Sequence, residues 1–559
     1  MANLILGPLL RHVGETTATI WVETDQPCVV DVLGCRTPTF TVFDHHYALV
    51  IVEGLRRGST TPYEVHLDGE RCWPPPTWRF PPSVIRTLDG GPVRILFGSC
   101  RAAAPHEPPW SLEYDHDERA RGVDALYAHG LRMLDQAPAQ WPHLLLLVGD
   151  QVYADDSSPD VRAKVEQRRG HLADDDSTPS LDDVADFEEY TWLYHEAWLP
   201  EVERWMLSVV PSAMIFDDHD MIDDWNTSLA WVEDIRRQPW WHEHVTGGLA
   251  SYWVYQHLGN LSPDEIRKQG MLHQFIGLGD ATAALSAWAD EAERMMVVPG
   301  GYRFSYIREL GHVRLVVIDS RCARVLTPGE RRMVDDEHWE WVVEHADVAC
   351  EHLVLATSVP VAMPGGLHDV EEWNELVSEG KWGRWFVGVG EKVRRAVDLE
   401  DWSAFHHSYV AMMDLVYDVA TPGRRPAADP PFTVTIVSGD VHFSFRSRAA
   451  LADRPGRPPA VSRVHQIVNS PIRNILSTRE RRVIRLGLSR AGELIGRILR
   501  RSAGARRDQT RWIVEDGPFF ANHMCLLEFG QHDARMVLER AEPDDDGQPV
   551  LTVVAHSAL

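Results

Sequence analysis

Short apolar runs, each followed by polar residues, recur along this chain and predict the strands of its core. The clearest runs lie at 93–97, 144–148, 213–216, 313–318, 353–356 and 433–437. Apolar runs of this length, bounded by turn-forming residues, are typical of strands that are covered on both faces. Longer stretches with helical patterns separate these runs, so residues 91–559 predict an α/β domain, or α+β by a strict count of layers.

Residues 1–90 have a different pattern. Short β-rich runs at 17–22, 28–33 and 40–42 are separated by clusters of Gly, Pro, Asp and Thr. Repeated short strands with turn signals between them are typical of a small antiparallel sandwich. We therefore expect an all-β domain, immunoglobulin-like or fibronectin-like, over residues 1–90, followed by a second domain over residues 91–559.

The composition excludes several classes of protein. The chain has 559 residues, of which 44% are hydrophobic and 25% charged, as in soluble globular proteins. Its net charge of −28 argues against nucleic-acid binding, which needs a basic surface. Seven irregularly spaced cysteines do not form a disulfide framework. The N-terminal sequence has no signal-peptide pattern and no apolar run is long enough to span a membrane, so we expect a cytoplasmic protein.

Three of the predicted strands end in acidic and histidine residues. Asp150 follows the run at 144–148, Asp218 and His219 follow 213–216, and Asp440 and His442 follow 433–437. The carboxyl ends of strands meet at one edge of an open α/β sheet, and ligands bind there. Because carboxylates and imidazoles are metal ligands, their convergence predicts a metal centre.

The strand at 93–97 ends in a different pair of residues, Cys100 and Arg101. A thiolate is a metal ligand that needs a nearby cation to stay ionised, and Tyr153 adds a phenol three residues after Asp150. Thiolate and phenolate together favour Fe³⁺ over Mg²⁺ or Ca²⁺. The fork of N–H donors on Arg101 suits a phosphate group. The alternatives are a packing role for Cys100 and a hydrogen-bonded core position for Tyr153.

Asp150 is the candidate for a bridging ligand. Two-metal sites hold their ions about 3.5–4 Å apart, and each oxygen of one carboxylate can reach a different ion. Gly149, directly before it, lets the chain turn sharply. We expect Asp217 to lie in the outer shell or to cap a helix. Arg321 follows another strand and would either contact substrate or pair with the acidic edge of the site.

The four strand-end motifs together resemble a known family. They are GSC (98–100), GDQVY (149–153), DDHD (217–220) and SGDVHF (438–443). In this order they closely resemble the alkaline phosphatase D (PhoD-like) family of the calcineurin-like metallophosphoesterases, and the β-rich N-terminal segment is similar to the small domain that precedes the catalytic domain there. The resemblance implies a metallophosphoesterase β-sandwich flanked by helices. It departs at Asp220, where the family usually has Glu.

The same resemblance implies a metal-dependent hydrolase of the alkaline phosphatase and phosphodiesterase type, in which a metal-bound hydroxide attacks phosphate mono- or diesters. The metals would be Fe³⁺ and Ca²⁺, with Zn, Mn or Mg as alternatives. Cys100, Asp150 and Tyr153 would hold the iron, and His219 would contact the phosphate and protonate the leaving oxygen; Arg101 is our own addition to the catalytic set. The metal ligands that the resemblance implies are Cys100, Asp150, Tyr153, Asp218, Asp440 and His442.

An arginine-rich segment at 479–511 is a separate feature. It contains eleven Arg, interleaved with Val, Ile and Leu. A basic amphipathic helix can lie on an anionic membrane surface, or its apolar stripe can pack on the core. Peripheral membrane contact would favour one of two alternatives: a phospholipase D-like phosphodiesterase acting at membranes, or a metal-stabilised scaffold that docks on membranes without catalysis.

Overall fold

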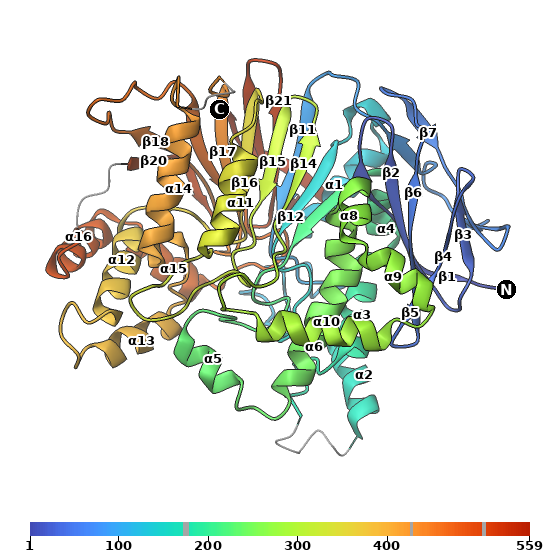
Figure 1. Ribbon diagram of the computed structural model, residues 1–559, viewed down its shortest axis with the longest axis horizontal. Coiled ribbons are helices and arrows are strands. Elements are labelled where there is room, and N and C mark those ends of the chain that lie inside the picture. The colour runs from blue at the N-terminus through green and yellow to red at the C-terminus, as the bar shows by residue number, and fades with distance from the viewer. Residues whose placement is uncertain (171–177, 425–428, 506–509) are drawn as a thin grey trace.

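The computed structural model describes residues 1–170, 178–424, 429–505 and 510–559. Within these ranges, two large mixed β-sheets form the centre of the molecule, with helices outside them (Figure 1). Buried residues of both sheets, such as Leu145 and Leu315, belong to one continuous hydrophobic core. The smaller N-terminal sheets lie at one end (Figure 1).

The first large sheet contains the strands that precede Asp150 and Asp218, β12 and β13, and also β11, the strand that precedes Cys100. Its order is β13-β12-β11-β21-β22-β23. The first three strands are parallel, and β21 pairs antiparallel with β11. The bounds are β11 Val93–Gly98, β12 Leu144–Val148, β13 Ser212–Ile215, β21 His523–Phe529, β22 Ala534–Pro543 and β23 Pro549–Ala558.

The second large sheet carries the last predicted metal-site strand, β17. Its order is β14-β15-β16-β17-β19-β18-β20. Strands β15, β16, β17 and β19 are parallel to one another. The bounds are β14 Tyr306–Leu310, β15 Val313–Val317, β16 His352–Ala356, β17 Thr433–Ser438, β18 Ser444–Leu451, β19 Arg463–Val468 and β20 Thr510–Phe519.

The N-terminal segment is all-β and antiparallel, with sheets ordered β1-β2-β6-β5, β4-β3-β8-β9 and β10-β7. The bounds are β1 Leu4–Val13, β2 Ala18–Thr24, β3 Val29–Val32, β4 Cys35–Pro38, β5 Phe40–Val42, β6 His45–Val52, β7 Thr60–Pro62, β8 Val65–Leu67, β9 Glu70–Trp73 and β10 Val84–Arg86. The predicted fold class, an α/β or α+β body preceded by an all-β segment, is confirmed.

Helices cover the outer faces of the sheets (Figure 1). On the side of the N-terminal sheets these are α1 Ala125–Leu134, α2 Pro159–Arg169, α3 Phe187–Trp198, α4 Glu201–Val209, α6 Trp241–Tyr252, the π-helical turn Trp253–His257, α7 Leu258–Asn260, α8 Pro263–Gln269, α9 Met271–Leu278 and α10 Thr282–Arg294. On the other side are α5 Leu229–Ile235, α11 Asp336–Ala346, α12 Gly366–Ser378, α13 Val387–Ala396, α14 His406–Val419, α15 Thr478–Gly487 and α16 Arg490–Ser502.

The basic segment at 479–511 corrects one expectation, because it forms two helices and not one. The chain breaks between α15 and α16, where the Ser489 side chain accepts a hydrogen bond from the backbone N–H of Gly492 (3.2 Å) and so caps the second helix. Residues 506–509 of that segment lie outside the described residues. In the described part of the chain, no helix combines the length and the apolar content needed to cross a membrane.

Candidate metal centre

The predicted ligands lie on strand ends with a constrained backbone. Cys100 follows β11, Asp150 follows β12, and Asp440 and His442 follow β17. These four residues have φ angles of 57°, 49°, 70° and 55°, in the left-handed region. Non-glycine residues in this region cost about 1–3 kcal/mol each and cluster at functional sites. The backbone at these strand ends is therefore strained, which indicates that the positions of the four side chains matter for function.

Two glycines let these strand ends approach one another closely. Gly149 has a φ of +112°, and a Cβ there would lie 2.7 Å from Cβ of Asp217. A Cβ at Gly439 would lie 1.9 Å from Oγ of Ser99. Neither position has room for a side chain, so the glycines of the GDQVY and SGDVHF motifs let four strand ends, those of β11, β12, β13 and β17, approach one another in pairs.

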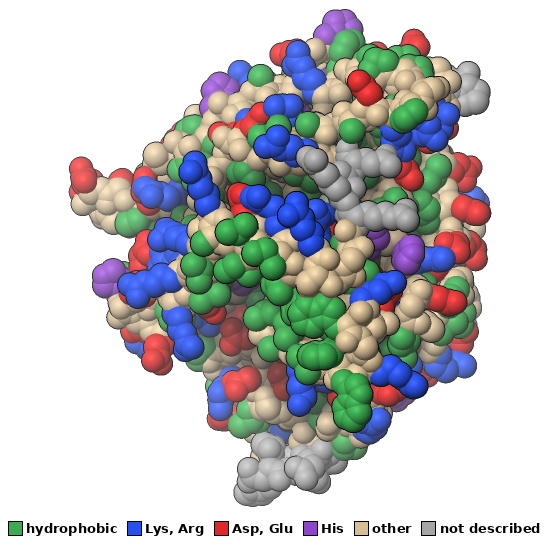
Figure 2. Space-filling view, turned by 90° about the vertical axis from the view of Figure 1, so that its left-hand side faces the viewer, with side chains coloured by type: hydrophobic (Ala, Val, Ile, Leu, Met, Phe, Trp, Pro, Cys, Tyr) green, Lys and Arg blue, Asp and Glu red, His purple; other side chains and the backbone are tan. Residues whose placement is uncertain are grey.

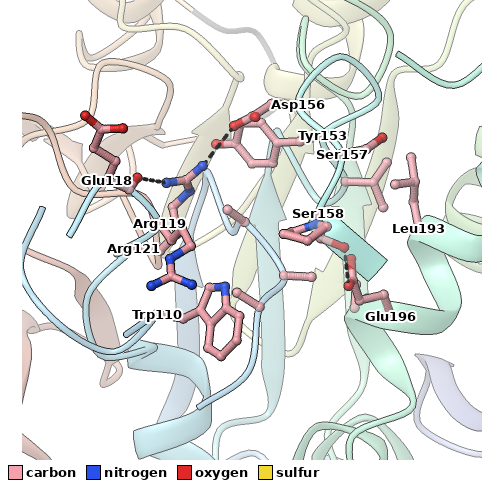
Figure 3. Close-up of a pocket in the computed structure, with 16 residues that line it drawn as sticks. Trp110, Glu118, Arg119, Arg121, Tyr153, Asp156, Ser157, Ser158, Leu193 and Glu196 are labelled. Atoms are coloured by element: carbon pink, nitrogen blue, oxygen red, sulfur yellow. Dashed lines mark hydrogen bonds and ion pairs between the residues drawn. The ribbon is translucent and has the colours of Figure 1, made fainter. Parts of the chain in front are cut away.

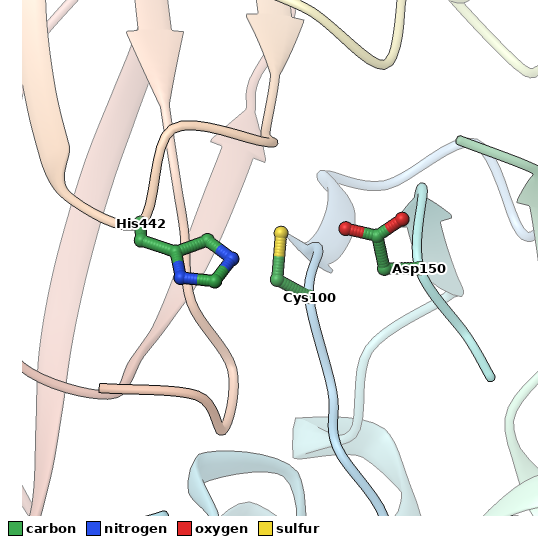
Figure 4. A group of neighbouring side chains, drawn as sticks. All are labelled: Cys100, Asp150 and His442. Atoms are coloured by element: carbon green, nitrogen blue, oxygen red, sulfur yellow. The ribbon is translucent and has the colours of Figure 1, made fainter. Parts of the chain in front are cut away.

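Two groups of possible ligand atoms share the carboxylate of Asp150; a third group contains Asp218, His219 and Asp223, and a fourth contains His106, Asp124 and Glu203. The first group contains Cys100, Asp150 and His442, and the thiol lies between the imidazole and the carboxylate (Figure 4). The second group contains Asp150, Asp217, Asp218 and Asp440. Within each group the atoms that could hold a metal lie within 4.8 Å of one another. Only Asp150 belongs to both, which is the position of a bridging ligand.

Asp150 is buried, and neither of its oxygens has a hydrogen-bond partner among the described residues. Burial raises the pKa of Asp150 well above its usual value; His219 opposes this rise, while Asp217 and Asp218 add to it. A buried carboxylate without partners costs free energy that a bound cation would remove. The side chain therefore fits a metal ligand and is poorly explained as a packing residue.

Cys100 and His442 bring softer donors to the first group. The Cys100 sulfur lies 3.1 Å from the hydroxyls of both Ser99 and Ser470. Burial, together with Asp150 and Asp440, raises the pKa of the Cys100 thiol well above its usual value, so a nearby cation is needed to hold it as thiolate. Burial and His219 lower the pKa of His442 to about 4, which leaves the neutral imidazole that metals bind.

Tyr153 is buried beside His219, with 4.8 Å between the two ring centroids. Its hydroxyl makes no hydrogen bond of normal geometry in the described structure, although the Asn474 side chain is near it. Burial, reinforced by Cys100 and Asp150, raises the pKa of Tyr153 well above its usual value. A phenolate here would also require a cation, as predicted for this residue.

His219 is oriented by a residue that the sequence did not single out, Asp155. The two oxygens of Asp155 lie 2.9 and 3.0 Å from Nδ1 of His219. Nε2 is 3.8 Å from the Asp223 carboxylate, which is too long for a hydrogen bond. Burial lowers the pKa of His219, but Asp155 and Asp218 outweigh it and hold that pKa well above its usual value. Asp155 thus fixes the orientation of the ring and favours its protonated form.

Asp217 and Arg321 form a buried ion-pair network behind the second group. Arg321 pairs with Asp217, with Asp218 at 3.1 Å and with Glu400 at 2.6 Å. Oδ1 of Asp217 also accepts a hydrogen bond from Ser358 (2.9 Å), whereas its Oδ2 has no partner among the described residues. Of the two roles considered for Arg321, the structure shows the ion pair. Asp217 belongs to the second group of possible ligand atoms, and its pair with Arg321 also fits the outer-shell position that we expected.

The structure does not bring Arg101 to the ligand cluster. Its three guanidinium nitrogens donate to Asp124 (2.9 Å), to the carbonyl of Ala197 (2.9 Å) and to Glu203 (2.6 Å), and the side chain is buried. These acceptors lie on the helix side of β11, where two carboxylates compensate the charge. The phosphate contact that we predicted for Arg101 would require it to leave this network.

Asp220, the residue at which the resemblance noted above departs by having Asp in place of Glu, has a supporting role. One oxygen accepts hydrogen bonds from the backbone N–H of Gln151 (3.2 Å) and from the Gln256 side chain (3.1 Å). The other accepts from the backbone N–H of Asp217 (2.9 Å). The shorter carboxylate therefore ties together the loops that carry Asp150 and Asp218.

A cavity of about 230 Å³ opens beside Tyr153 (Figure 3). Trp110, Arg121 and Glu196 also line it. Arg121 pairs with Asp156 at 3.2 Å, and Ser158 donates a hydrogen bond to Glu196 (2.6 Å). Because Tyr153 lines this cavity and its ring also packs beside His219, the space adjoins the candidate metal centre.

Comparisons with known proteins support the fold. A solved structure titled "Structure of PhoD" matches with a TM-score of 0.51 at 10% identity, over 98% of this chain and 89% of that chain. A dimetal phosphatase from Danio rerio matches with a TM-score of 0.32 at 9% identity, over 84% of this chain and all of that one. We take the likeness of fold from the PhoD structure alone.

The sequence comparisons add one family. Residues 1–85 match the model of a domain of unknown function, DUF7800. No curated protein matches the chain. The chain therefore has a PhoD-like fold, and its activity has to be argued from the site.

Proposed function

We propose that this protein is a metal-dependent phosphoesterase, a hydrolase of the alkaline phosphatase and phosphodiesterase type. One observation carries the proposal: the buried Asp150, whose oxygens have no hydrogen-bond partner among the described residues, belongs both to the group with Cys100 and His442 and to the group of four aspartates. Two cations bridged by a carboxylate would neutralise a phosphate and activate water near neutral pH. The PhoD-like fold supports the same conclusion.

The donor types of the two groups suggest different metals. The first group offers thiol, imidazole and carboxylate, and Tyr153 can add a phenol oxygen; this set suits Fe³⁺. The second group offers only carboxylates, which suit Ca²⁺ or another hard divalent ion. We propose Cys100, Asp150, Tyr153 and His442 as ligands of the iron. Asp218, Asp440 and the bridging Asp150 would hold the second ion.

His219 would act on the leaving group. Asp155 fixes its Nδ1, so Nε2 is the nitrogen that can donate a proton to the departing alcohol oxygen. Arg321 would act through Asp217 and Asp218, whose charge it compensates from behind. The cavity beside Tyr153 offers space for the organic group of the ester, with the Trp110 ring as an apolar wall.

The test is hydrolysis of p-nitrophenyl phosphate and bis-p-nitrophenyl phosphate by the purified protein after loading with iron and calcium. We expect turnover of at least one ester, and the ratio of the two rates ranks monoester against diester. No turnover with either ester after metal loading would contradict the proposal and leave a metal-stabilised scaffold as the alternative.

The role of His219 has its own test. His219→Gln should slow esters of aliphatic alcohols by about a hundredfold or more, because such leaving groups need a proton. It should slow p-nitrophenyl esters much less, since p-nitrophenolate leaves without one. Equal losses on both substrates would show that His219 does not protonate the leaving group.

A further inference from the structure

An exposed basic and apolar surface lies beside the candidate metal centre. We define the basic–apolar face by two segments. One is residues 381–395, the loop before α13 together with most of α13, and the other is the α15–α16 hairpin, residues 478–502. Both segments pack against α12 or its neighbours on one side of the molecule, the left-hand side of Figure 1. Hydrophobic side chains gather on this side with Arg and Lys around them (Figure 2).

The inner side of the hairpin is packed on the body. Ile484 and Leu488 contact the cluster that contains Phe443, the residue after His442. Arg500 pairs with Asp369 (2.9 Å) and Glu372 (3.2 Å) of α12. A Cβ at Gly496 would lie 2.6 Å from the Gly366 carbonyl oxygen, so the two helices are in close contact. The hairpin is thus held against the strand end that carries His442.

The outer side of the hairpin is apolar and exposed. Leu486 is 65% exposed, Ile498 57% and Leu494 56%, and Val483 and Ile495 are similarly open. Trp385 on the neighbouring segment is 94% exposed and is followed by the exposed Phe386. Scattered single apolar residues need no explanation, but this concentration on one face marks an interaction site.

The charge of the face is opposite to that of the whole protein. Residues 478–502 contain eight Arg against two Glu, and residues 381–395 contain five basic residues against one Glu, in a chain with a net charge of −28. Arg479, Arg482 and Arg490 are exposed and have no ion-pair partner among the described residues. These three guanidinium groups are therefore available to an anionic surface, whereas Arg394 is buried and Arg395, Arg497 and Arg500 pair with carboxylates of the protein.

We propose that the basic–apolar face docks on anionic lipid bilayers. Exposed Leu, Ile, Trp and Phe can enter the headgroup region, while the surrounding Arg and Lys contact anionic lipids, each contributing about 1 kcal/mol. Trp and Phe on a loop flanked by basic residues suit the membrane interface. The partner is a surface and not a single ligand, because the exposed residues lie on two separate segments.

The test is flotation of the full-length protein with vesicles of phosphatidylcholine alone and with vesicles of about two parts phosphatidylcholine to one part phosphatidylserine. We expect binding to the anionic vesicles only, weakened by salt. Arg479→Gln with Arg482→Gln should weaken it about 30-fold, as two lost contacts of about 1 kcal/mol predict. Ile495→Ser with Ile498→Ser should weaken it by about tenfold or more.

Matched controls lie outside the face. Arg36→Gln with Arg57→Gln removes two exposed basic residues of the N-terminal sheets, and Leu278→Ser with Val553→Ser removes two residues that are each 54% exposed. Neither pair should change vesicle binding. Failure of the unchanged protein to float with anionic vesicles at low salt, or equal losses in the controls, would overturn the proposal. So would a dimer in sedimentation that Ile495→Ser with Ile498→Ser dissociates while vesicle binding is absent.

Discussion

Two buried polar clusters lie near the end of β11, one around Arg101 and one around Asp150, and they differ in how their charges are compensated. In the cluster around Arg101, the Asp124 carboxylate accepts from Arg101 and caps α1, while one Glu203 oxygen accepts from both Arg101 and His106. In the cluster around Asp150, both oxygens of that carboxylate lack a partner within the described residues. In the first cluster the charges are paired with one another, and Oε2 of Glu203 and Nδ1 of His106 are left without a partner among the described residues. In the second, bound cations would supply the counter-charge that Asp150 lacks.

The pKa values of the two carboxylates follow this difference. Burial raises the pKa of Asp124, but Arg101 and the nearby His106 and Arg473 outweigh it and bring it down to about 2. Burial and like charges raise the pKa of Asp150 well above its usual value. The two carboxylates are equally buried, yet their pKa values shift in opposite directions. Neighbouring charges, and not burial, therefore distinguish a structural carboxylate from a candidate metal ligand.

The largest expected effect is the loss of catalysis on substitution of Asp150. Asp150→Asn removes the bridging charge, and the loss of metal-supported charge stabilisation, about 4 kcal/mol, should lower kcat/KM about a thousandfold. Asp124→Asn should leave kcat/KM of the folded enzyme nearly unchanged. The measurement is steady-state hydrolysis of p-nitrophenyl phosphate. Comparable activity losses in both variants would erase the distinction between the clusters.

The next largest effect is on stability, and here we expect substitution of Asp124 in the Arg101 cluster to matter. Asp124→Asn leaves the buried Arg101 short of a counter-charge and should lower the free energy of unfolding by about 3–5 kcal/mol. Urea unfolding measures the change. Glu64→Gln, which breaks an exposed pair with Arg71 (3.2 Å), is the matched control and should have little effect. An Asp124→Asn variant with an unchanged free energy of unfolding would show that the Arg101 network is not needed for the fold.

Metal removal should affect only the Asp150 cluster. A chelator should lower the free energy of unfolding by about 3 kcal/mol if the metal was present at about a hundred times its Kd. In the chelated state Asp150→Asn should be more stable than the unchanged protein by about 1–3 kcal/mol, because it relieves a buried unpaired carboxylate. Thermal unfolding with and without chelator checks both. An Asp150→Asn protein that still loses stability on chelation would place the metal elsewhere.

A third cluster, between β6 and α3, predicts the smallest effect. His45 lies 2.7 Å from Glu188 and 3.1 Å from Glu23. Burial lowers the pKa of His45, but these two carboxylates raise it from 6.5 to about 9. A raised histidine pKa stabilises the fold fully below pH 6.5, and the contribution is lost as the pH rises through about 9. Because the side chain is partly exposed, the loss should be about 1–2 kcal/mol.

Unfolding measured from pH 6 to pH 10 tests the third cluster, with His45→Gln as the comparison. The variant should be less stable at low pH and should lack this loss on going to alkaline pH. The same pH dependence in both proteins would show that another group is responsible.

The strand ends could be predicted because they depend on local sequence. A buried apolar run followed by Gly-Asp or Asp-His shows in a few residues where a strand stops and what it carries. Cys100, Asp150, Asp218, Asp440 and His442 could therefore be named as candidate ligands, and the structure places each of them in one of the two groups that share Asp150. The predicted strands at 93–97, 144–148 and 433–437 correspond to β11, β12 and β17.

The partners of those residues could not be predicted, because they come from far along the chain. Glu400 meets Arg321 across 79 residues, and Asp155 meets His219 across 64. Arg101 was assigned to phosphate because it follows Cys100, yet its side chain turns to Asp124 and Glu203 on α1 and α4. Sequence proximity shows where a backbone goes; it does not show to which side a long side chain turns.

The most direct test of the central claim is elemental analysis and a visible absorption spectrum of the purified protein, with Asp150→Asn prepared in parallel. We predict stoichiometric metal in the unchanged protein, with iron giving a tyrosinate-to-iron band, and loss of bound metal in the variant. A protein that contains no metal and takes up none when iron, calcium, zinc, manganese and magnesium are offered would contradict the account.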